Sequence, residues 1–177
     1  MRTDLIIAGV GGQGSIMAGT LLGTAAVVFD NKKALQTQSY SSELRGGAAV
    51  TWVIVSDEVI VYPRVVHPDI LVAQAPQAVT RYLSQLKPCG TLIIDSDMVQ
   101  DPPHNGYTLI QIPATSIANR EIGNSIVTNL LVLGVLIGAT RVVSPDAIEK
   151  AIHLSIPKPK VDMNLKAFRR GLEIVSS

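Results

Sequence analysis

The sequence contains a single cysteine, Cys89, and this scarcity excludes several kinds of site. One cysteine cannot form a disulfide within the chain, and there is no Cys-x-x-Cys pair or Cys/His cluster to hold an iron–sulfur cluster or structural zinc. The three histidines, His67, His104 and His153, are scattered without metal-ligand spacing. Any electron-transfer centre that works with this protein is therefore expected on another chain.

The sequence also lacks an excess of charge of either sign and a long hydrophobic run. Its 15 basic and 14 acidic residues give a formal charge of +1, so there is no reason to expect a nucleic-acid or anionic membrane partner. The most apolar segment, residues 126–139, has 14 residues, whereas roughly 20 are needed to span a bilayer. We interpret it as a helix buried in protein. The N-terminus shows no signal-peptide pattern, so we expect a cytoplasmic protein.

Apolar residues are plentiful enough for one core. They make up 47% of the 177 residues, and no internal repeat or domain-sized linker divides the chain. We therefore expect a single domain, residues 1–177.

Strand-like and helix-like segments alternate along the chain. Strands are predicted at 5–8, from about 35, and at 48–55, 59–62, 69–73, 91–95 and 107–112; helices are predicted at 15–29, 76–86, 117–121, 126–139, 145–156 and 162–172. Residues 48–55 and 59–62 flank a polar tip and are predicted to form an antiparallel hairpin. Residues 157–160 (PKPK) are interpreted as an extended connector, with Asp162 capping the last helix. The pattern predicts an α/β three-layer sandwich with a mixed, mostly parallel sheet and an inserted β-hairpin.

A glycine-rich turn near the N-terminus is the first candidate site. Gly9, Gly11 and Gly14 satisfy the pattern GxGxxG, and Gly12 is an additional glycine. Such a turn between a strand and a helix aims backbone N–H groups and the positive end of the helix dipole at one point. The sequence therefore predicts an anion site here.

Dinucleotide binding is one interpretation of this turn. A Rossmann unit needs an acidic residue at the end of its second strand, to hold the ribose hydroxyls. The candidate strand here runs into Gln38, Ser39 and Tyr40, and Asp30 comes before that strand. A free-standing NAD or FAD enzyme stays open as an alternative, as does a turn whose glycines only permit a tight bend.

A second glycine motif follows at residues 42–47 (SELRGG). Arg45 is followed by Gly46 and Gly47, which places a bidentate donor on a backbone that other groups can approach closely. This combination suits a phosphate, a carboxylate or a loop of a partner. The structural alternative is a bend in which Arg45 pairs with Glu43.

The remaining reactive residue types give little support for catalysis within the chain. Ser15 has no GxSxG surroundings, and Cys89 lies in a turn-like KPCG segment. Asp95, Asp97 and Asp101 can bind a cation, although carboxylates at strand ends are usually solvated or cap helices. We find no self-sufficient active site.

Three stretches together resemble the gamma subunit of 2-oxoacid:ferredoxin oxidoreductases, which act on pyruvate, 2-oxoglutarate, branched-chain 2-oxoacids or indolepyruvate. They are residues 9–26 (GVGGQGSIMAGTLLGTAA), 39–56 (SYSSELRGGAAVTWVIVS) and 122–139 (IGNSIVTNLLVLGVLIGA), with weaker similarity at 164–171 (NLKAFRRG). One departure is local, because many relatives have Tyr-Gly-Pro-Glu before Arg-Gly-Gly, where this chain has residues 40–44 (YSSEL).

The resemblance implies a complex that uses thiamine diphosphate, Mg, iron–sulfur clusters and coenzyme A (CoA), and that passes electrons to ferredoxin. Cofactors of the reaction then belong to sibling alpha, beta and delta subunits. This chain is expected to bind none alone, to be inactive alone, and to help form the substrate or CoA channel. Its expected anion, CoA or subunit-interface loops are Gly11, Gly12, Gln13, Gly14, Arg45, Gly46 and Gly47.

Overall likeness favours 2-oxoglutarate over pyruvate as the substrate of the complex. Surfaces meant for partners tend to be apolar and to self-associate, so the isolated chain can form a homodimer. A binding or regulatory module for an unrelated phosphorylated ligand is a third interpretation.

Overall fold

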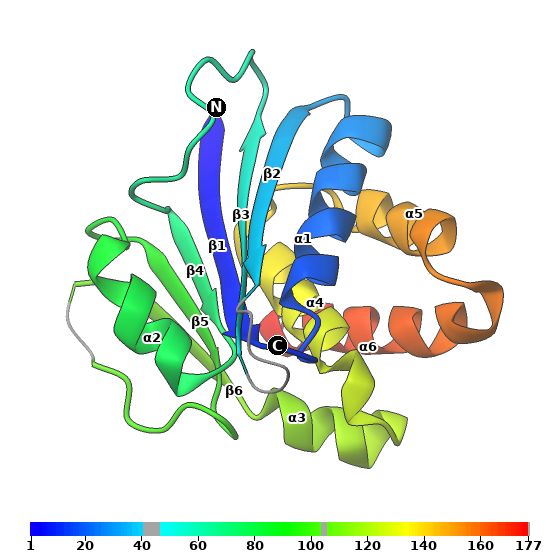
Figure 1. The fold of residues 1–177 in the computed structure, drawn as a ribbon. Coiled ribbons are helices and arrows are strands. Elements are labelled where there is room, and N and C mark those ends of the chain that lie inside the picture. Colours follow the sequence, from blue (N-terminus) through cyan, green and yellow to red (C-terminus); the bar gives the residue numbers. More distant parts are fainter. Residues whose placement is uncertain (41–46, 104–105, 177) are drawn as a thin grey trace.

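A computed structural model describes residues 1–40, 47–103 and 106–176. Its centre is a six-stranded sheet with the strand order β2-β3-β1-β4-β5-β6 (Figure 1). The strands are β1 (Arg2–Val10), β2 (Lys33–Tyr40), β3 (Ala48–Ser56), β4 (Ile70–Ala73), β5 (Thr91–Asp95) and β6 (Thr108–Ile112).

Strand directions confirm the predicted mixed, mostly parallel sheet. Strands β1, β4, β5 and β6 pair in parallel, whereas β3 pairs antiparallel with both β1 and β2. Strand β2 therefore runs in the same direction as β1, and β3 alone is reversed in the described sheet. The antiparallel hairpin in the sheet is the β2–β3 pair, and not the predicted pair of residues 48–55 and 59–62.

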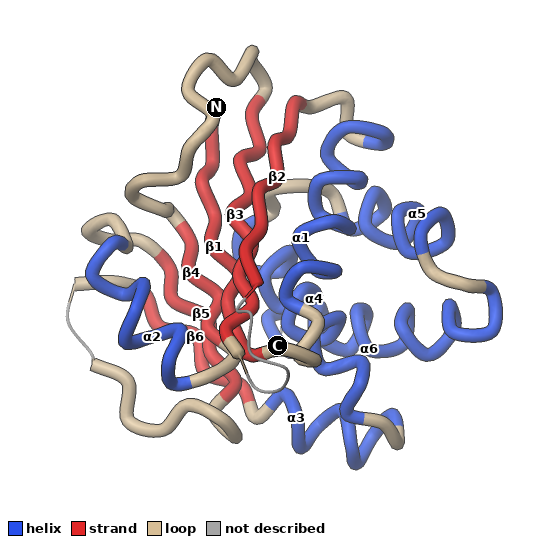
Figure 2. The backbone as a smooth tube through the Cα atoms, viewed as in Figure 1, coloured by secondary structure: helices blue, strands red, loops and turns tan. Residues whose placement is uncertain are grey.

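Helices cover both faces of the sheet, which gives the three predicted layers (Figure 2). One face carries α2 (Pro76–Tyr82), which continues into η2 (Leu83–Gln85). The other face carries α1 (Ser15–Thr24) with η1 (Ala25–Phe29), α3 (Ala114–Ile117) with η3 (Ala118–Ile122), η4 (Ser125–Val127) with α4 (Thr128–Thr140), α5 (Pro145–Ser155) and α6 (Lys158–Ser176). None of the helices in the described ranges is long and apolar enough to cross a membrane.

Strand β1 shows how the two faces are filled. Leu5 and Ile7 point into the larger core beneath α1, α4, α5 and α6, and Ile6 and Ala8 point into the smaller core beneath α2. All four are at most 2% exposed. A strand buried on both faces is apolar at every position rather than at alternate ones, which is the pattern from which this strand was predicted.

Helix α4 is the buried helix predicted from the most apolar segment, and it crosses α6 at backbone contact. A Cβ atom on Gly134 would lie 2.1 Å from the carbonyl oxygen of Phe168, and one on Gly171 would lie 2.0 Å from that of Leu131. Glycine at both positions therefore permits the two helices to approach this closely.

The strand predicted at residues 59–62 is wrong. This segment is a loop in which Val59 and Val61 are 77% and 88% exposed. Strand β3 has no free edge for it, because β1 and β2 already pair with its two sides. The guanidinium of Arg2 also donates hydrogen bonds to the carbonyl oxygens of Tyr62 and Arg64, which holds the loop away from sheet geometry.

The extended connector predicted at residues 157–160 is wrong as well. Helix α6 begins at Lys158, so Asp162 lies within the helix rather than at its N-cap. Pro159 falls in the first turn, where the missing N–H of proline removes no intrahelical hydrogen bond. Proline there marks a helix start, not a linker.

Candidate functional site

The glycine turn, residues 11–14, lies at the carboxyl end of β1 and leads directly into α1 (Figure 1). Helix α1 packs on one face of the sheet, and α2, which follows the neighbouring parallel strand β4, packs on the other. A crevice opens where successive crossovers of a parallel sheet leave on opposite faces, and ligands of open α/β sheets bind at such points. The predicted position of the turn is confirmed.

The turn contacts the second glycine motif through its backbone. The N–H of Gly11 donates to the carbonyl oxygen of Gly47 at 2.8 Å. Gly12 and Gly14 have φ values of 93° and 74°, in the left-handed region that favours glycine. Arg45 and Gly46, and with them the alternative pairing of Arg45 with Glu43, lie outside the described residues, as does His104.

Gln13 folds back over the turn. Its Oε1 accepts a hydrogen bond from the N–H of Val10 at 2.7 Å, and its Nε2 donates to the carbonyl oxygen of Gln74 at 2.9 Å. Gln74 directly follows β4 and is 3% exposed. A single side chain therefore ties the ends of β1 and β4 together.

A second layer of polar contacts lies beneath the turn. The hydroxyl of Ser15 donates to Oε1 of Gln74 at 2.6 Å, and Nδ2 of Asn129 donates to the carbonyl oxygen of Gly14 at 3.3 Å. Ser15 and Asn129 are 1% and 3% exposed. The Ser15 hydroxyl is thus committed to an amide acceptor rather than to a base, which agrees with the absence of a nucleophile motif.

A pocket of about 330 Å³ opens beside the turn. Its uncharged polar side chains are the amides and hydroxyls of Gln13, Gln74, Thr115, Asn124, Ser125 and Thr128. The pocket is also lined by one buried carboxylate, that of Asp95. No cationic side chain of the described ranges lines it, and no described side chain caps the N-terminus of α1. Any positive potential at the turn therefore has to come from backbone N–H groups and the α1 dipole.

Asp95, at the floor of the pocket, acts as a helix cap. It is 2% exposed, and it accepts hydrogen bonds from the N–H groups of Asp97, Ala114 and Thr115 and from the Thr115 hydroxyl at 2.6 to 3.2 Å. Asp97 accepts from the N–H and hydroxyl of Ser116. For Asp95 and Asp97 the structure therefore supports helix capping, one of the roles expected of carboxylates at strand ends. The described residues hold no group of three or more His, Cys, Asp and Glu that suits a metal ion.

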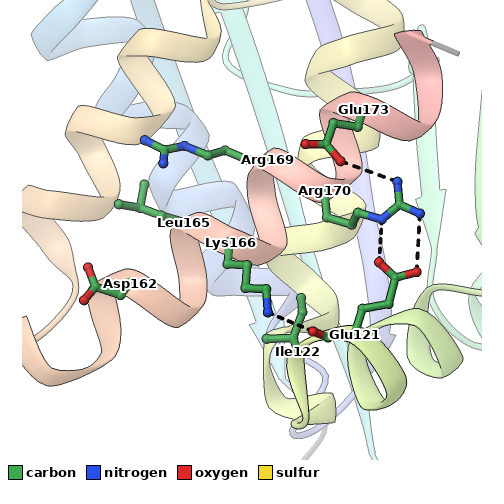
Figure 3. Close-up of a pocket in the computed structure, with 8 residues that line it drawn as sticks. All are labelled: Glu121, Ile122, Asp162, Leu165, Lys166, Arg169, Arg170 and Glu173. Atoms are coloured by element: carbon green, nitrogen blue, oxygen red, sulfur yellow. Dashed lines mark hydrogen bonds and ion pairs between the residues drawn. The ribbon is translucent and has the colours of Figure 1, made fainter.

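A second pocket, of about 370 Å³, lies over α6 far along the chain from the turn (Figure 3). Arg170 donates two hydrogen bonds of 2.6 and 3.3 Å to the carboxylate of Glu121, and Lys166 donates to the Glu121 carbonyl oxygen at 2.9 Å. The Arg170 guanidinium lowers the pKa of Glu121. These contacts join η3 to α6, so we interpret this pocket as structural.

Sequence reasoning named Gln13 but missed Gln74 and Asn129. The sequence position of each residue could have indicated its role. Gln74 stands directly after a buried strand, where side chains converge on the carboxyl edge of a parallel sheet, and Asn129 is an amide inside the most apolar segment of the chain. A buried amide in such a helix needs a polar partner, and its partner is the glycine turn.

Comparison with known proteins identifies the class to which this fold and turn belong. The pattern of the pyruvate ferredoxin/flavodoxin oxidoreductase family (POR) matches residues 4–174. Because the match spans nearly the whole sequence, the chain belongs to this family.

Individual relatives narrow the class. The chain is 45% identical to the 2-oxoglutarate synthase subunit KorC of Methanocaldococcus jannaschii, over 98% of this chain and 94% of that protein. The crystal structure of the keto/oxoacid ferredoxin oxidoreductase gamma subunit from Geobacter sulfurreducens superposes with a TM-score of 0.87 at 37% identity, over 98% of both chains. The chain is a gamma-type subunit of a multi-subunit 2-oxoacid oxidoreductase, as its resemblance implied.

A third match shows the fold alone. The 2-oxoglutarate:ferredoxin oxidoreductase from Magnetococcus marinus, solved with 2-oxoglutarate, coenzyme A and succinyl-CoA bound, superposes with a TM-score of 0.86 at 20% identity. It covers 99% of this chain and 31% of that one, so the same fold there forms about a third of a longer polypeptide. These matches give no support to the free-standing dinucleotide enzyme.

Proposed function

We propose that this chain is the gamma subunit of a 2-oxoglutarate:ferredoxin oxidoreductase. The observation that carries the proposal is the 45% identity to a 2-oxoglutarate synthase subunit over 98% of the chain. In the proposed reaction the C1–C2 bond of 2-oxoglutarate breaks and CO₂ leaves. Two electrons pass to ferredoxin, and the succinyl group is transferred to the thiol of CoA.

We assign the cofactors of this reaction to alpha, beta and delta subunits. The chain has one cysteine, and its described residues contain no cluster of metal-ligating side chains. They therefore do not fit Mg-bound thiamine diphosphate or an iron–sulfur cluster. The proposed role of this single domain, residues 1–177, is to complete the assembly.

CoA fits the chemistry of the glycine turn better than thiamine diphosphate or an iron–sulfur cluster does. Phosphate oxygens accept hydrogen bonds from backbone N–H groups at a helix N-terminus. The amides of CoA match the uncharged polar side chains of the pocket, among them Gln13, Thr115 and Ser125. When bound, CoA supplies the thiol that accepts the acyl group. The residues of this chain would orient it, with Gly11–Gly14 and Arg45–Gly47 along the same channel wall. The alternative is that the turn contacts a loop of a neighbouring subunit instead of CoA.

Co-expression with the three sibling subunits tests the proposed function. The assembled complex is assayed for CoA-dependent ferredoxin reduction with 2-oxoglutarate, pyruvate, 2-oxoisovalerate and indolepyruvate. The proposal predicts a much higher kcat/KM for 2-oxoglutarate than for the other three acids. A preference for any of the others would contradict the substrate, and failure of the chain to join the complex would contradict the subunit role.

A further inference from the structure

Asn129 lies directly behind the glycine turn. It is the second residue of α4, 3% exposed, and its Nδ2 donates to the carbonyl oxygen of Gly14 at 3.3 Å. A Cβ atom on Gly14 would lie 2.4 Å from that nitrogen. The amide of Asn129 therefore occupies the space that a side chain at residue 14 would need.

The orientation of this amide follows from its partner. A carbonyl oxygen only accepts hydrogen bonds, so the NH₂ end must face Gly14 and the Oδ1 end must point away. No residue in the described part of the chain donates to Oδ1, which is buried. A buried carbonyl without a partner costs stability, and the hydrogen bond to Gly14 is the favourable polar contact of this amide among the described residues.

That contact fixes the peptide group that joins the turn to α1. The carbonyl of Gly14 and the N–H of Ser15 belong to one planar peptide group, so holding the carbonyl sets the direction of the N–H. The same carbonyl accepts the N–H of Ala18 at 3.0 Å, the first hydrogen bond of α1. On the other side of the peptide, the Ser15 hydroxyl is held by Gln74.

We infer that Asn129 is a positioning residue, which holds the peptide between Gly14 and Ser15 and thereby the shape of the turn, whose residues Gly12 and Gln13 line the pocket. The inference rests on the proposed role of the turn in binding CoA. It assigns a positioning role to a residue of the apolar helix that does not itself line the pocket.

The test uses Asn129→Leu, which keeps side-chain volume and removes the donor, in the assembled complex. Two quantities are measured: hydrogen–deuterium exchange in peptides covering residues 10–18, and KM and kcat with CoA as the varied substrate. We expect faster exchange in these peptides and a rise in the KM for CoA of about fivefold, as for one lost hydrogen bond, with a smaller change in kcat. Asn129→Ser, which keeps a short donor, should restore part of both.

Asn164→Leu is the matched control. Asn164 is similarly buried, at 7% exposed, but its Nδ2 donates to the Lys160 carbonyl within its own helix α6. This variant should leave exchange at residues 10–18 and the KM for CoA unchanged, whatever it does to stability. If Asn164→Leu loosens the turn as much as Asn129→Leu, the effect is general loss of stability and the inference is overturned.

The remaining outcomes separate the inference from the proposed function. Faster exchange in the turn without any change in the KM for CoA supports the positioning role of Asn129 and contradicts CoA binding at the turn. Unchanged exchange in both Asn129 variants overturns the positioning role, whether or not the KM for CoA changes.

Discussion

Gln13 closes the glycine turn by accepting the N–H of Val10 on its Oε1 at 2.7 Å. A side chain of the turn's own sequence therefore holds its shape. Such preorganisation lowers the ordering cost of binding, because the loop does not have to be fixed when the ligand arrives.

Gly9→Ala should open the turn. A Cβ atom at residue 9 would lie 2.3 Å from Oε1 of Gln13 and 3.2 Å from Cβ of Gln74, so Gln13 must leave its place. We expect a loss of about 1–3 kcal/mol in the free energy of unfolding, the usual cost of overpacking. Urea denaturation measures it.

Gly23→Ala is the matched control for that substitution. It lies in α1, and a Cβ atom there would meet nothing within 4 Å. Alanine should stabilise the helix by about 0.5–1 kcal/mol. Equal effects of the two substitutions would show that the Gln13 contact does not limit residue 9.

Gly134→Ala should be among the most damaging single-methyl additions in the chain. The added Cβ would meet the Phe168 carbonyl oxygen at 2.1 Å, and backbone atoms cannot move aside as a flexible side chain does, so α4 and α6 must separate. We expect a loss of about 3 kcal/mol or more. Gly138→Ala on the same helix, where the nearest atom is Val175 Cβ at 3.3 Å, should cost far less in the same thermal unfolding measurement.

Arg2→Leu should release the loop at residues 57–69. Arg2 pairs with the carboxylate of Asp4 at 2.7 Å and donates to the carbonyl oxygens of Tyr62 and Arg64. Without these donors the middle of the loop loses its contacts with Arg2, whereas the hydrogen bonds between Asp69 and Asp4 remain. Limited proteolysis should cut the variant faster within this loop, with Arg170→Leu at the other end of the molecule as the control; an unchanged cleavage rate would mean that other contacts hold the loop.

The ion pair between Arg169 and Glu149 predicts a dependence of stability on pH. Arg169 donates two hydrogen bonds of 2.6 and 2.8 Å to the Glu149 carboxylate, which lowers the pKa of Glu149 below its ordinary value of 4.5. A carboxyl with a lowered pKa in the folded state stabilises the fold above the ordinary pKa, and this contribution is lost as pH falls through the lowered value.

Glu149→Gln should therefore remove part of the acid sensitivity. Urea unfolding between pH 7 and pH 3 should show a smaller fall in the free energy of unfolding for the variant than for the natural sequence below the ordinary pKa. The difference between the two proteins should be modest, because the pair is partly exposed. A difference that stays constant across this range would contradict the contribution of the ion pair.

Much of the fold could be predicted because burial leaves a clear pattern. The strand at 91–95 was predicted with the bounds that the structure has, and Pro145 marked the start of α5. The prediction at residues 59–62 was wrong because the composition of a segment does not show that β1 and β2 already occupy both edges of β3. Pairing partners are set by the whole sheet, which a local pattern does not contain.

The residues of the turn could be predicted from the sequence, but the contacts that hold the turn could not. The glycines and Gln13 predict a turn because they lie close together in the sequence. The contacts that hold the turn join residues 59 and 115 positions apart, Ser15 with Gln74 and Gly14 with Asn129. Such contacts exist only after the crossovers have folded.

Reconstitution with and without this chain tests the central claim, that it shapes a reaction site whose reactive groups lie on its partners. The account predicts no ferredoxin reduction by the isolated chain with 2-oxoglutarate and CoA, and full activity when it is combined with the alpha, beta and delta subunits. Turnover of a 2-oxoacid by the isolated chain, or an undiminished CoA-dependent reaction when the chain is left out, would contradict it.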